Sequence, residues 1–299
     1  MKIRLRGVEQ GLEKPPNAAL RVRARPEEEA IDEEAKKLLK AGLIEPARSP
    51  FNSLPMLVEK PTPEGEPKQW RTVLDYRAVN KLLEKDVYPL PNMEMNLSRL
   101  GKANWYTICD LLSGFWQVEL EDDGISKEAT AFSTRDAQYQ WVRMPMGLAS
   151  SPSTFMRLVH AVLNGLPPEI CLAYVDDVII PTCGTFDDHM RDVGMVFDRL
   201  IEGGFAVKCN KTHIGLTEVS HLGFMCGKYG TRPLGEKTQA IFDMAIADMW
   251  GNPAAAARYA GMLTFYSRFI PDCQQLLAPF SDLKAKNAPT DHIIGRKGS

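Results

Sequence analysis

The sequence lacks several features that mark common classes of protein. Its six cysteines are spread over 299 residues with no Cys-x-x-Cys pair, so no zinc-binding motif is present. A net charge of -2 and a pI near 6.3 exclude a uniformly basic nucleic-acid coat, although they allow a local basic groove. There is no signal peptide and no apolar run near the length of about 18 residues that spans a membrane. We therefore expect an intracellular protein with reduced, mostly buried thiols.

The composition that remains is typical of a globular protein. It is 44% hydrophobic and 25% charged, which excludes a disordered chain. The length is compatible with one large domain or with two to three sub-domains around a common core. No internal repeat is visible.

Two adjacent acids, Asp176 and Asp177, stand between two apolar runs rich in β-branched residues. Residues 170–175 and 178–180 have the composition of strands, which predicts a β-hairpin with the acids at or beside its turn. Because adjacent carboxylates repel and burial removes them from water, a divalent cation is the simplest partner for them. A solvated turn is the alternative, since Asp is common in turns, and the pair alone favours that alternative.

A third acid, Asp110, ends the apolar run of residues 104–110, which predicts another strand. Phe115 follows five residues later and begins an alternating run, residues 115–120, that also predicts a strand. Phe115 is near enough to Asp110 in sequence to share a site with it. Without other context, however, an aromatic residue here is more often part of the core.

A hairpin is predicted from two apolar runs, residues 54–60 and 69–76, that flank a turn over residues 61–67. Lys60, Lys68 and Arg71 cluster there. They are typical of a solvated edge that resists aggregation, and equally of a cationic tip that binds phosphates. Taken alone, the solvated edge is favoured.

Helical periodicity and capping signals mark the other elements. We expect helices from Pro26 to Gly42, after Ser150 or Ser151, and from Thr185 to Glu202. Residues 236–250 and 253–270 are predicted as two further helices. Short strands are expected around residues 129–133, 138–143, 205–207 and 219–226.

The three acids suggest one chemistry. If the strand ending at Asp110 and the Asp176–Asp177 hairpin are neighbours in an antiparallel sheet, three carboxylates converge. Two divalent ions about 3.5–4 Å apart need such ligands for phosphoryl or nucleotidyl transfer. Lys60 and Arg71 would then hold a triphosphate. The residues by themselves therefore point to a metal-dependent nucleotidyl transferase.

Seven blocks of sequence carry a resemblance to a known family. They are Leu38–Pro46 (LLKAGLIEP), Trp70–Asn80 (WRTVLDYRAVN), Asp110–Gln117 (DLLSGFWQ), Met144–Phe155 (MPMGLASSPSTF), Tyr174–Asp177 (YVDD), His221–Phe224 (HLGF) and Gly261–Ile270 (GMLTFYSRFI). In this order and spacing the chain resembles the reverse transcriptase domain of gypsy-type LTR retrotransposon Pol polyproteins and, more distantly, retroviral reverse transcriptases. The resemblance extends from about residue 20 to about residue 283.

The resemblance implies an α+β fold, the right-hand polymerase fold with fingers, a palm of antiparallel sheet packed on helices, and a helical thumb. The expected division is a basic N-terminal arm (1–25), fingers with the first palm elements (26–100), palm (101–232) with a fingers return at about 121–145, thumb (233–283) and a disordered tail (284–299).

It also implies roles for single residues. Asp110, Asp176 and Asp177 match the catalytic metal-binding triad, and Lys211 matches a lysine that protonates the pyrophosphate leaving group. The incoming nucleotide would contact Lys60, Arg71, Phe115, Met146 and Gly147, with Phe115 as the steric gate against a ribose 2′-hydroxyl and with Lys68 competing for the role of Lys60. Leu222 and Gly223 match the primer grip.

Several positions depart from the family pattern without removing a catalytic acid. Phe115 stands where Tyr is frequent, Met146 replaces the usual Phe or Gln, His221 replaces an aromatic residue, and Ala129 stands where Lys is common. The chain also stops just after the expected thumb. We therefore expect a shortened piece of a polyprotein, without its ribonuclease H, protease and integrase.

The expected activity is RNA-directed DNA polymerisation with two Mg²⁺ ions, for which Mn²⁺ can substitute. Its partners would be an RNA or DNA template, a primer strand, dNTPs and, as further options, other Pol polyprotein parts or a second copy of the chain. No membrane is expected, and the location would be cytoplasmic, in a virus-like particle, or nuclear. Two alternatives stay open: an RNA-dependent RNA polymerase, against which Phe115 argues, and a catalytically weak or inactive retroelement remnant that binds nucleic acid as a scaffold.

Overall fold

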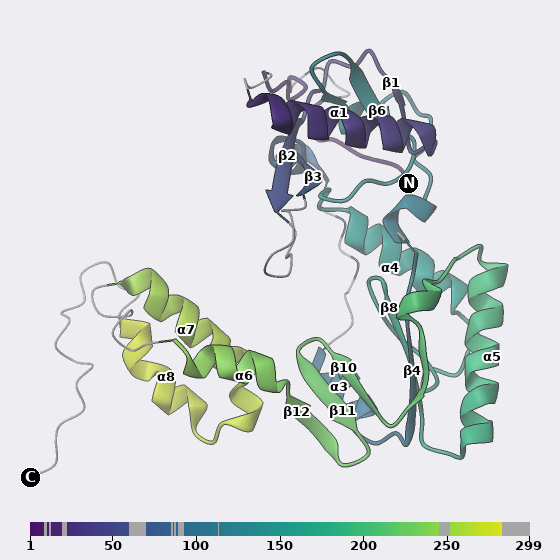
Figure 1. Cartoon of the computed structure of the whole chain (residues 1–299), viewed down its shortest axis with the longest axis vertical. Coiled ribbons are helices and arrows are strands. Elements are labelled where there is room, and N and C mark those ends of the chain that lie inside the picture. Colours follow the sequence, from purple (N-terminus) through teal and green to yellow (C-terminus); the bar gives the residue numbers. More distant parts are fainter. Residues whose placement is uncertain are drawn as a thin grey trace, which may run out of the picture. The chain divides into compact units, whose positions relative to one another are not determined.

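The computed structural model of the chain describes residues 1–8, 11, 13–19, 23–59, 70–84, 86, 88, 93–112, 114–244 and 252–282. These residues form two compact units. The first unit contains residues 1–92, 107–180 and 187–214, and the second contains residues 93–106, 181–186 and 215–299. Three of the boundaries between them fall inside strands, so each unit is built from segments distant in sequence. Figure 1 colours the chain by sequence position.

The first unit begins with a small α+β layer. Its elements are α1 (Arg25–Lys40), β1 (Ile44–Pro46), β2 (Leu54–Glu59), β3 (Trp70–Asp75), α2 (Arg77–Leu82), β5 (Phe132–Ser133) and β6 (Gln138–Trp141). Strands β2 and β3 form an antiparallel hairpin in which Val58 pairs with Arg71, as the sequence predicts. A second sheet has the order β1-β6-β5. Helix α1 has Pro in its first turn, acids at its start and lysines in its last turn, which suits the helix dipole.

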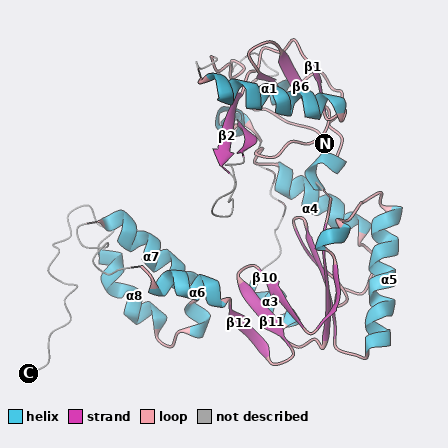
Figure 2. Ribbon diagram, in the orientation of Figure 1, coloured by secondary structure: helices cyan, strands magenta, loops and turns pink. Residues whose placement is uncertain are grey.

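A four-stranded sheet of order β7-β8-β4-β9 follows. Figure 2 draws the strands of the molecule in magenta and its helices in cyan. Its strands are β4 (Trp105–Asp110), β7 (Leu172–Tyr174), β8 (Asp177–Thr182) and β9 (His213–Leu216), and its helices are α4 (Ser151–Val162) and α5 (Phe186–Glu202). Val178, Ile179 and Ile180 of β8 and Phe155, Met156 and Val159 of α4 are fully buried. This burial of apolar side chains holds the strand that starts at Asp177 rigidly in place.

The second unit joins a hairpin sheet to helices. Its elements are α3 (Met93–Leu100), β10 (Glu218–His221), β11 (Phe224–Gly227), β12 (Gly230–Pro233), α6 (Gly235–Phe242), α7 (Pro253–Phe265) and α8 (Cys273–Asp282), with a 3₁₀ turn, η5 (Ser267–Phe269), before α8. The sheet order is β10-β11-β12. Phe224 packs against the rings of Phe265, Tyr266 and Phe269, so an aromatic cluster links the sheet to the segment from α7 to η5.

Several sequence-based expectations about elements were wrong. Residues 205–207 do not form a strand, because only Val207 pairs there, in an isolated bridge with Leu111. Residues 115–120 do not form a strand, because Gly114–Gln117 turn as a 3₁₀ helix, η1. Residues 129–130 lie in another 3₁₀ turn, η2 (Glu128–Thr130), so β5 starts later. Residues 219–226 form two strands separated by Leu222 and Gly223, whose positive φ angles reverse the chain. Helix α8 was not predicted. Residues 245–251, which include the end of the helix expected over residues 236–250, lie outside the described residues.

The N-terminal segment, expected as a basic arm, is anchored at its start. Ile3 and Leu5 are buried in the core, and Leu5 pairs with Leu83 in an isolated bridge. The backbone N–H of Ile3 donates to Ser126 at 2.8 Å. None of the six cysteines, all of which lie among the described residues, forms a disulfide; Cys183 and Cys209 are exposed, and Cys109, Cys226 and Cys273 are buried. No helix among the described residues is long and apolar enough to span a membrane.

Candidate active site

The three predicted acids come together at the ends of two neighbouring strands. Asp110 is the last residue of β4, and Asp177 is the first of β8, where it pairs with Tyr174 across a two-residue turn. That turn consists of Val175 and Asp176. The N–H of Leu111 donates to the carbonyl of Asp176 at 2.9 Å, which ties the turn to the end of β4. The hairpin predicted from sequence is therefore confirmed, with Asp176 in the turn and Asp177 directly after it.

The turn carries backbone strain. Val175 has a φ of 53°, a left-handed conformation that a β-branched residue adopts only when its surroundings enforce it. Its N–H contacts the sulfur of Met156 on α4 at 3.0 Å. Strained backbone of this kind concentrates at functional sites, where it fixes the direction of neighbouring side chains.

Gly114 provides the space that Asp176 occupies. A Cβ at Gly114 would lie 2.6 Å from Asp176 Oδ1 and 2.6 Å from Cζ of Phe155. Only glycine permits this approach, because a real Cβ is not found so close to another heavy atom. Asp176 Oδ1 is buried and has no hydrogen-bond partner. An orphaned carboxylate oxygen is costly, so its position indicates that something absent from the protein chain satisfies it.

Asp176 and Asp177 share one electrostatic environment. Burial raises the pKa of both carboxyls above the ordinary value, and the neighbouring charge of Asp110 raises it further. Lys208 opposes this rise in pKa at both acids, and Lys211 also opposes it at Asp177, without cancelling it. The pair therefore favours any added positive charge.

Asp110 has the opposite environment. Partial burial by itself would raise the pKa of its carboxyl, but hydrogen bonds and charge from two lysines outweigh this and lower it. Lys208 Nζ lies 2.5 Å from Asp110 Oδ1, and Lys211 Nζ lies 3.2 Å from Oδ2. Lys211, predicted to belong to the site, is therefore brought to the acids, and Lys208 joins it.

The segment of residues 206–211 reaches Asp110 through backbone pairing. Leu111 and Val207 form an antiparallel bridge, and the N–H of Lys208 donates to the carbonyl of Asp110 at 2.9 Å. The Gln117 amide fastens the same pairing, since it donates to the carbonyl of Leu112 and accepts from the N–H of Ala206. A short 3₁₀ turn, η3 (Cys209–Lys211), follows, so Lys211 returns to the side of Lys208.

The donor set suits a divalent metal in kind. Three carboxylates share the site, and one buried oxygen, Asp176 Oδ1, lacks a partner. Carboxylate oxygens are the ligands that Mg²⁺ prefers. Within the described part of the chain, however, no three His, Cys, Asp or Glu side chains are already grouped as metal ligands. Both oxygens of Asp110 are engaged by lysines.

Comparison with known proteins places the chain in a family. Residues 58–226, more than half of the chain, match the family described as reverse transcriptase (RNA-dependent DNA polymerase). The chain belongs to the reverse transcriptase family. Its reverse transcriptase domain is 35% identical over 270 residues to the retrovirus-related Pol polyprotein from transposon gypsy of Drosophila melanogaster, covering 89% of this chain and 25% of that polyprotein. Against the corresponding polyprotein from transposon 297 of the same organism the identity is 31% over 261 residues, covering 87% and 24%.

Solved structures confirm the mixed α+β reverse transcriptase fold. A foamy viral protease-reverse transcriptase in complex with double-stranded DNA matches with a TM-score of 0.76 and 26% identity, over 93% of this chain and 47% of that one. The same type of protein in complex with an RNA/DNA hybrid gives a TM-score of 0.73 and 26% identity, over 92% and 35%. This reverse transcriptase domain thus spans about a quarter of the retrotransposon polyproteins it matches.

Phe115 of the reverse transcriptase domain follows Gly114 in η1. Its ring meets that of Phe155 edge to face, with centroids 5.3 Å apart, and Phe155 in turn packs on Phe205. Phe115 is half-buried, so one part of the ring is fixed by the core while the rest is accessible. The core role and a role in the site are compatible at this position.

Met146 and Gly147 lie in the turn before α4. Gly147 has a φ of 97°, and a Cβ there would lie 3.3 Å from the Tyr76 ring. Asn80 holds this turn from α2: its side-chain amide donates to the Gly147 carbonyl and accepts from the N–H of Ala149, both at 2.9 Å. Met146 is 53% exposed, which leaves its side chain available for contact with a ligand.

The predicted triphosphate-binding residues are located only in part. Arg71 lies in β3 opposite Val58. Lys60, like its competitor Lys68, lies outside the described residues.

Leu222 and Gly223, predicted as the primer grip, form the two-residue turn between β10 and β11 in the second unit. Both have positive φ, 49° and 87°. Tyr266 and Phe265 lie within van der Waals distance of the place where a Cβ on Gly223 would be, so the turn rests on the aromatic cluster.

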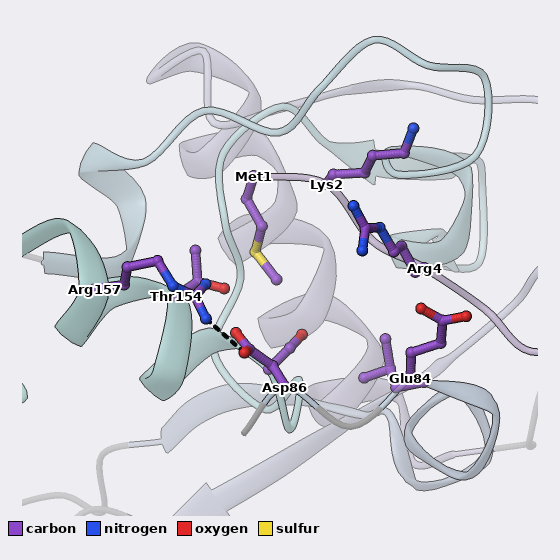
Figure 3. Close-up of a pocket in the computed structure, with 9 residues that line it drawn as sticks. Met1, Lys2, Arg4, Glu84, Asp86, Thr154 and Arg157 are labelled. Atoms are coloured by element: carbon purple, nitrogen blue, oxygen red, sulfur yellow. Dashed lines mark hydrogen bonds and ion pairs between the residues drawn. The ribbon is translucent and has the colours of Figure 1, made fainter. Parts of the chain in front are cut away.

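A separate cavity of about 400 Å³ lies elsewhere in the first unit (Figure 3). Its wall includes Arg4, Glu84 and the 2.6 Å ion pair between Asp86 and Arg157. Cations and acids are mixed there, and the residues that line it do not include the three acids of the sheet. We therefore place the candidate site at the strand ends and not in this cavity.

Sequence reasoning missed four residues of this neighbourhood: Gly114, Gln117, Asn80 and Lys208. Gly114, Gln117 and Asn80 lie inside blocks that carried the resemblance, so a signal existed for them. Lys208 had none except its spacing of three residues from Lys211, which becomes informative only once η3 is known.

Proposed function

We propose that this domain is the RNA-directed DNA polymerase core of a retroelement, which extends a primer by adding deoxynucleotides to its 3′-hydroxyl. The observation that carries the proposal is the meeting of Asp110, Asp176 and Asp177 at two adjacent strand ends, with Asp176 Oδ1 buried and unpartnered. Family membership supports it, because the family is described as RNA-dependent DNA polymerase.

In the proposed mechanism, Asp110, Asp176 and Asp177 would hold two Mg²⁺ ions, or Mn²⁺ in their place. When bound, such ions activate the attacking hydroxyl and stabilise charge on the phosphates. The protein contributes rigidity: the strained Val175 and the absence of a side chain at Gly114 fix Asp176 in place before any ligand arrives.

Other residues have proposed roles around this centre. Lys211 donates the proton to the pyrophosphate leaving group, since its ammonium already lies beside Asp110. Phe115 excludes the 2′-hydroxyl of a ribonucleotide with its ring. Lys60 and Arg71 bind the triphosphate, Met146 and Gly147 contact the nucleotide and template, and Leu222 and Gly223 hold the primer end.

The proposal includes the division into fingers (26–100, with a return at about 121–145), palm (101–232) and helical thumb (233–283). It also includes the partners: a template–primer duplex, dNTPs and, as alternatives for assembly, other Pol parts or a second copy of the chain. Related structures bound to DNA and to an RNA/DNA hybrid support a duplex as the substrate class. The proposed place of action is a cytoplasmic virus-like particle or the nucleus.

Primer extension tests this proposal directly. The full chain should extend oligo-dT on poly-rA with dTTP in the presence of Mg²⁺ or Mn²⁺, and EDTA should abolish the extension. The variant with both Asp176→Asn and Asp177→Asn should lose at least about 10³-fold in rate. The substitutions remove two proposed metal ligands and the negative charges that attract the metal ions. Full activity in this variant would exclude the proposed site.

A second candidate is a nucleic-acid-binding scaffold with little or no turnover. One observation favours it: Lys208 and Lys211 both form ion pairs with Asp110. Template–primer binding without incorporation, with Mg²⁺ and with Mn²⁺, would support this candidate.

A further inference from the structure

Lys208 lies beside the three acids and has none of the proposed catalytic roles. Its ammonium group lies 2.5 Å from Asp110 Oδ1, while that of Lys211 lies 3.2 Å from the other oxygen, Oδ2. Each carboxylate oxygen therefore has its own cation. The oxygens that a metal ion would need on Asp110 are already engaged by protein charges.

Lys208 is held at this place more firmly than Lys211. The N–H of Lys208 donates to the Asp110 carbonyl at 2.9 Å, so its backbone and its side chain bind the same residue. The Lys208 carbonyl accepts from the N–H of Lys211 at 3.0 Å and from the Thr212 hydroxyl at 2.9 Å. Its side chain is 27% exposed, compared with 59% for Lys211. Less exposure means weaker screening by water, so the Lys208 contact is the stronger of the two.

Asp176 differs from Asp110 in this respect. Asp176 keeps a buried oxygen without a hydrogen-bond partner. Positive charge in this site is therefore concentrated on Asp110. A divalent ion that binds all three carboxylates is repelled by these ammonium groups and competes with them for the Asp110 oxygens.

We propose that Lys208 is a positioning residue that holds the Asp110 carboxylate in the metal-free protein and gives way when a divalent ion binds, so that it sets the metal affinity of the site. This inference rests on the proposed function, in which Asp110 is a metal ligand. It assigns different tasks to the two lysines: Lys208 competes with the metal, and Lys211 stays available for proton transfer.

The test is Mn²⁺ binding to the full chain without nucleotide or nucleic acid, measured from the EPR signal of free Mn²⁺. Lys208→Met removes the competing charge and keeps much of the side-chain length. It should bind Mn²⁺ at least about tenfold more tightly than the unchanged protein, which corresponds to about 1.4 kcal/mol. Lys208→Arg keeps the charge and should bind Mn²⁺ no more tightly than the unchanged protein.

Two controls separate this effect from general electrostatics. Lys40→Met, at the exposed end of α1, removes the same net charge and should leave the affinity unchanged. Lys211→Met should tighten binding less than Lys208→Met, because Lys211 is farther from its oxygen and more exposed. Circular dichroism confirms that each variant is folded.

Each outcome decides the inference. Tighter binding by Lys208→Met supports it, including the case in which the unchanged protein binds no Mn²⁺ at all. Equal or weaker binding by Lys208→Met, equal tightening by Lys208→Arg, or no binding by any variant overturns it. Primer extension is scored separately: an inactive protein that shows the expected Mn²⁺ shift loses the polymerase proposal and keeps this inference, whereas an active protein without the shift does the reverse.

Discussion

Two hairpin turns of this molecule have the same length and the same left-handed first residue, but they differ in their second residue. Val175 and Asp176 join β7 to β8, and Leu222 and Gly223 join β10 to β11. In each turn the first residue is a non-glycine with positive φ, 53° at Val175 and 49° at Leu222. Two-residue turns require such angles to match the twist of the strands.

The second residue makes the difference. Gly223 adopts a φ of 87° without strain, and its turn rests on aromatic side chains. Asp176 instead places a carboxylate against Gly114, beside Asp177, where the two acids repel each other. The first turn therefore destabilises the fold by holding repelling charges close together, while the second residue of the other turn adds no such repulsion. Under the proposed function, the first turn carries metal ligands, whereas the second holds the primer end on an aromatic support.

The largest effect is expected from Gly114→Ala, which breaks the support of the acidic turn. The new Cβ would lie 2.6 Å from Asp176 Oδ1, so either the acid or Phe155 has to move. Overpacking of this kind lowers the free energy of unfolding by about 1–3 kcal/mol. Urea unfolding measures this loss, and primer extension should fall at least about 100-fold because the acid is displaced.

Gly194→Ala is the matched control for that variant. Gly194 lies within α5, and a Cβ there would meet no atom within 4 Å. It should raise the free energy of unfolding by about 0.5–1 kcal/mol, since Ala is the better helix former. If both variants lose stability to the same degree, the close approach at Gly114 is not the cause.

Gly223→Ala tests the supporting turn and should have the next largest effect. The aromatic neighbours leave room for a methyl group, with the Tyr266 hydroxyl 3.4 Å away, so the penalty comes from the positive φ. A left-handed alanine costs roughly 1–2 kcal/mol. Thermal unfolding should show the loss, and unchanged stability would mean that the turn readily adopts another conformation.

Removing the acids should stabilise the first turn by a smaller amount. Burial, and then Asp110, raise the pKa of Asp176 and Asp177, so their ionised forms destabilise the folded state at pH 7. The variant with Asp176→Asn and Asp177→Asn should therefore have a Tm a few degrees higher than the unchanged protein in EDTA. The difference in Tm between the two proteins should become smaller as the pH falls through the raised pKa values, because protonation of Asp176 and Asp177 then removes the same charges. A lower Tm for this variant at pH 7 would contradict the assumed repulsion.

The smallest effect is expected from Leu222→Asn. Asn tolerates positive φ better than Leu, and the sequence Asn-Gly is the preferred pair for this type of turn. The free energy of unfolding should stay within about 1 kcal/mol of the unchanged value. If Leu222 contacts the primer, the rate of primer extension should fall even though the free energy of unfolding hardly changes. Comparing the two measurements therefore separates a role in primer binding from a role in stability.

Much of the fold could be predicted from local sequence. The hairpin β2–β3 and helices α1, α4 and α5 agree with periodicity and capping signals, because apolar spacing and turn residues act over short distances. Residues 115–120 could not be predicted correctly. Their alternation is typical of a strand, but the chain turns at Gly114 into η1. The missing side chain of Gly114 leaves room there for the carboxylate of Asp176.

The sequence by itself determined the identity of the family, the three acids and the hairpin that carries two of them, since seven ordered blocks and an apolar-acid-acid-apolar pattern are local information. Only the tertiary structure decided the charge balance of the site. Lys208 lies 98 positions from Asp110 along the chain, and the antiparallel bridge between Leu111 and Val207 brings the two together. Which acid is neutralised and which stays exposed to repulsion depends on distances between strands, and no spacing along one chain contains those distances.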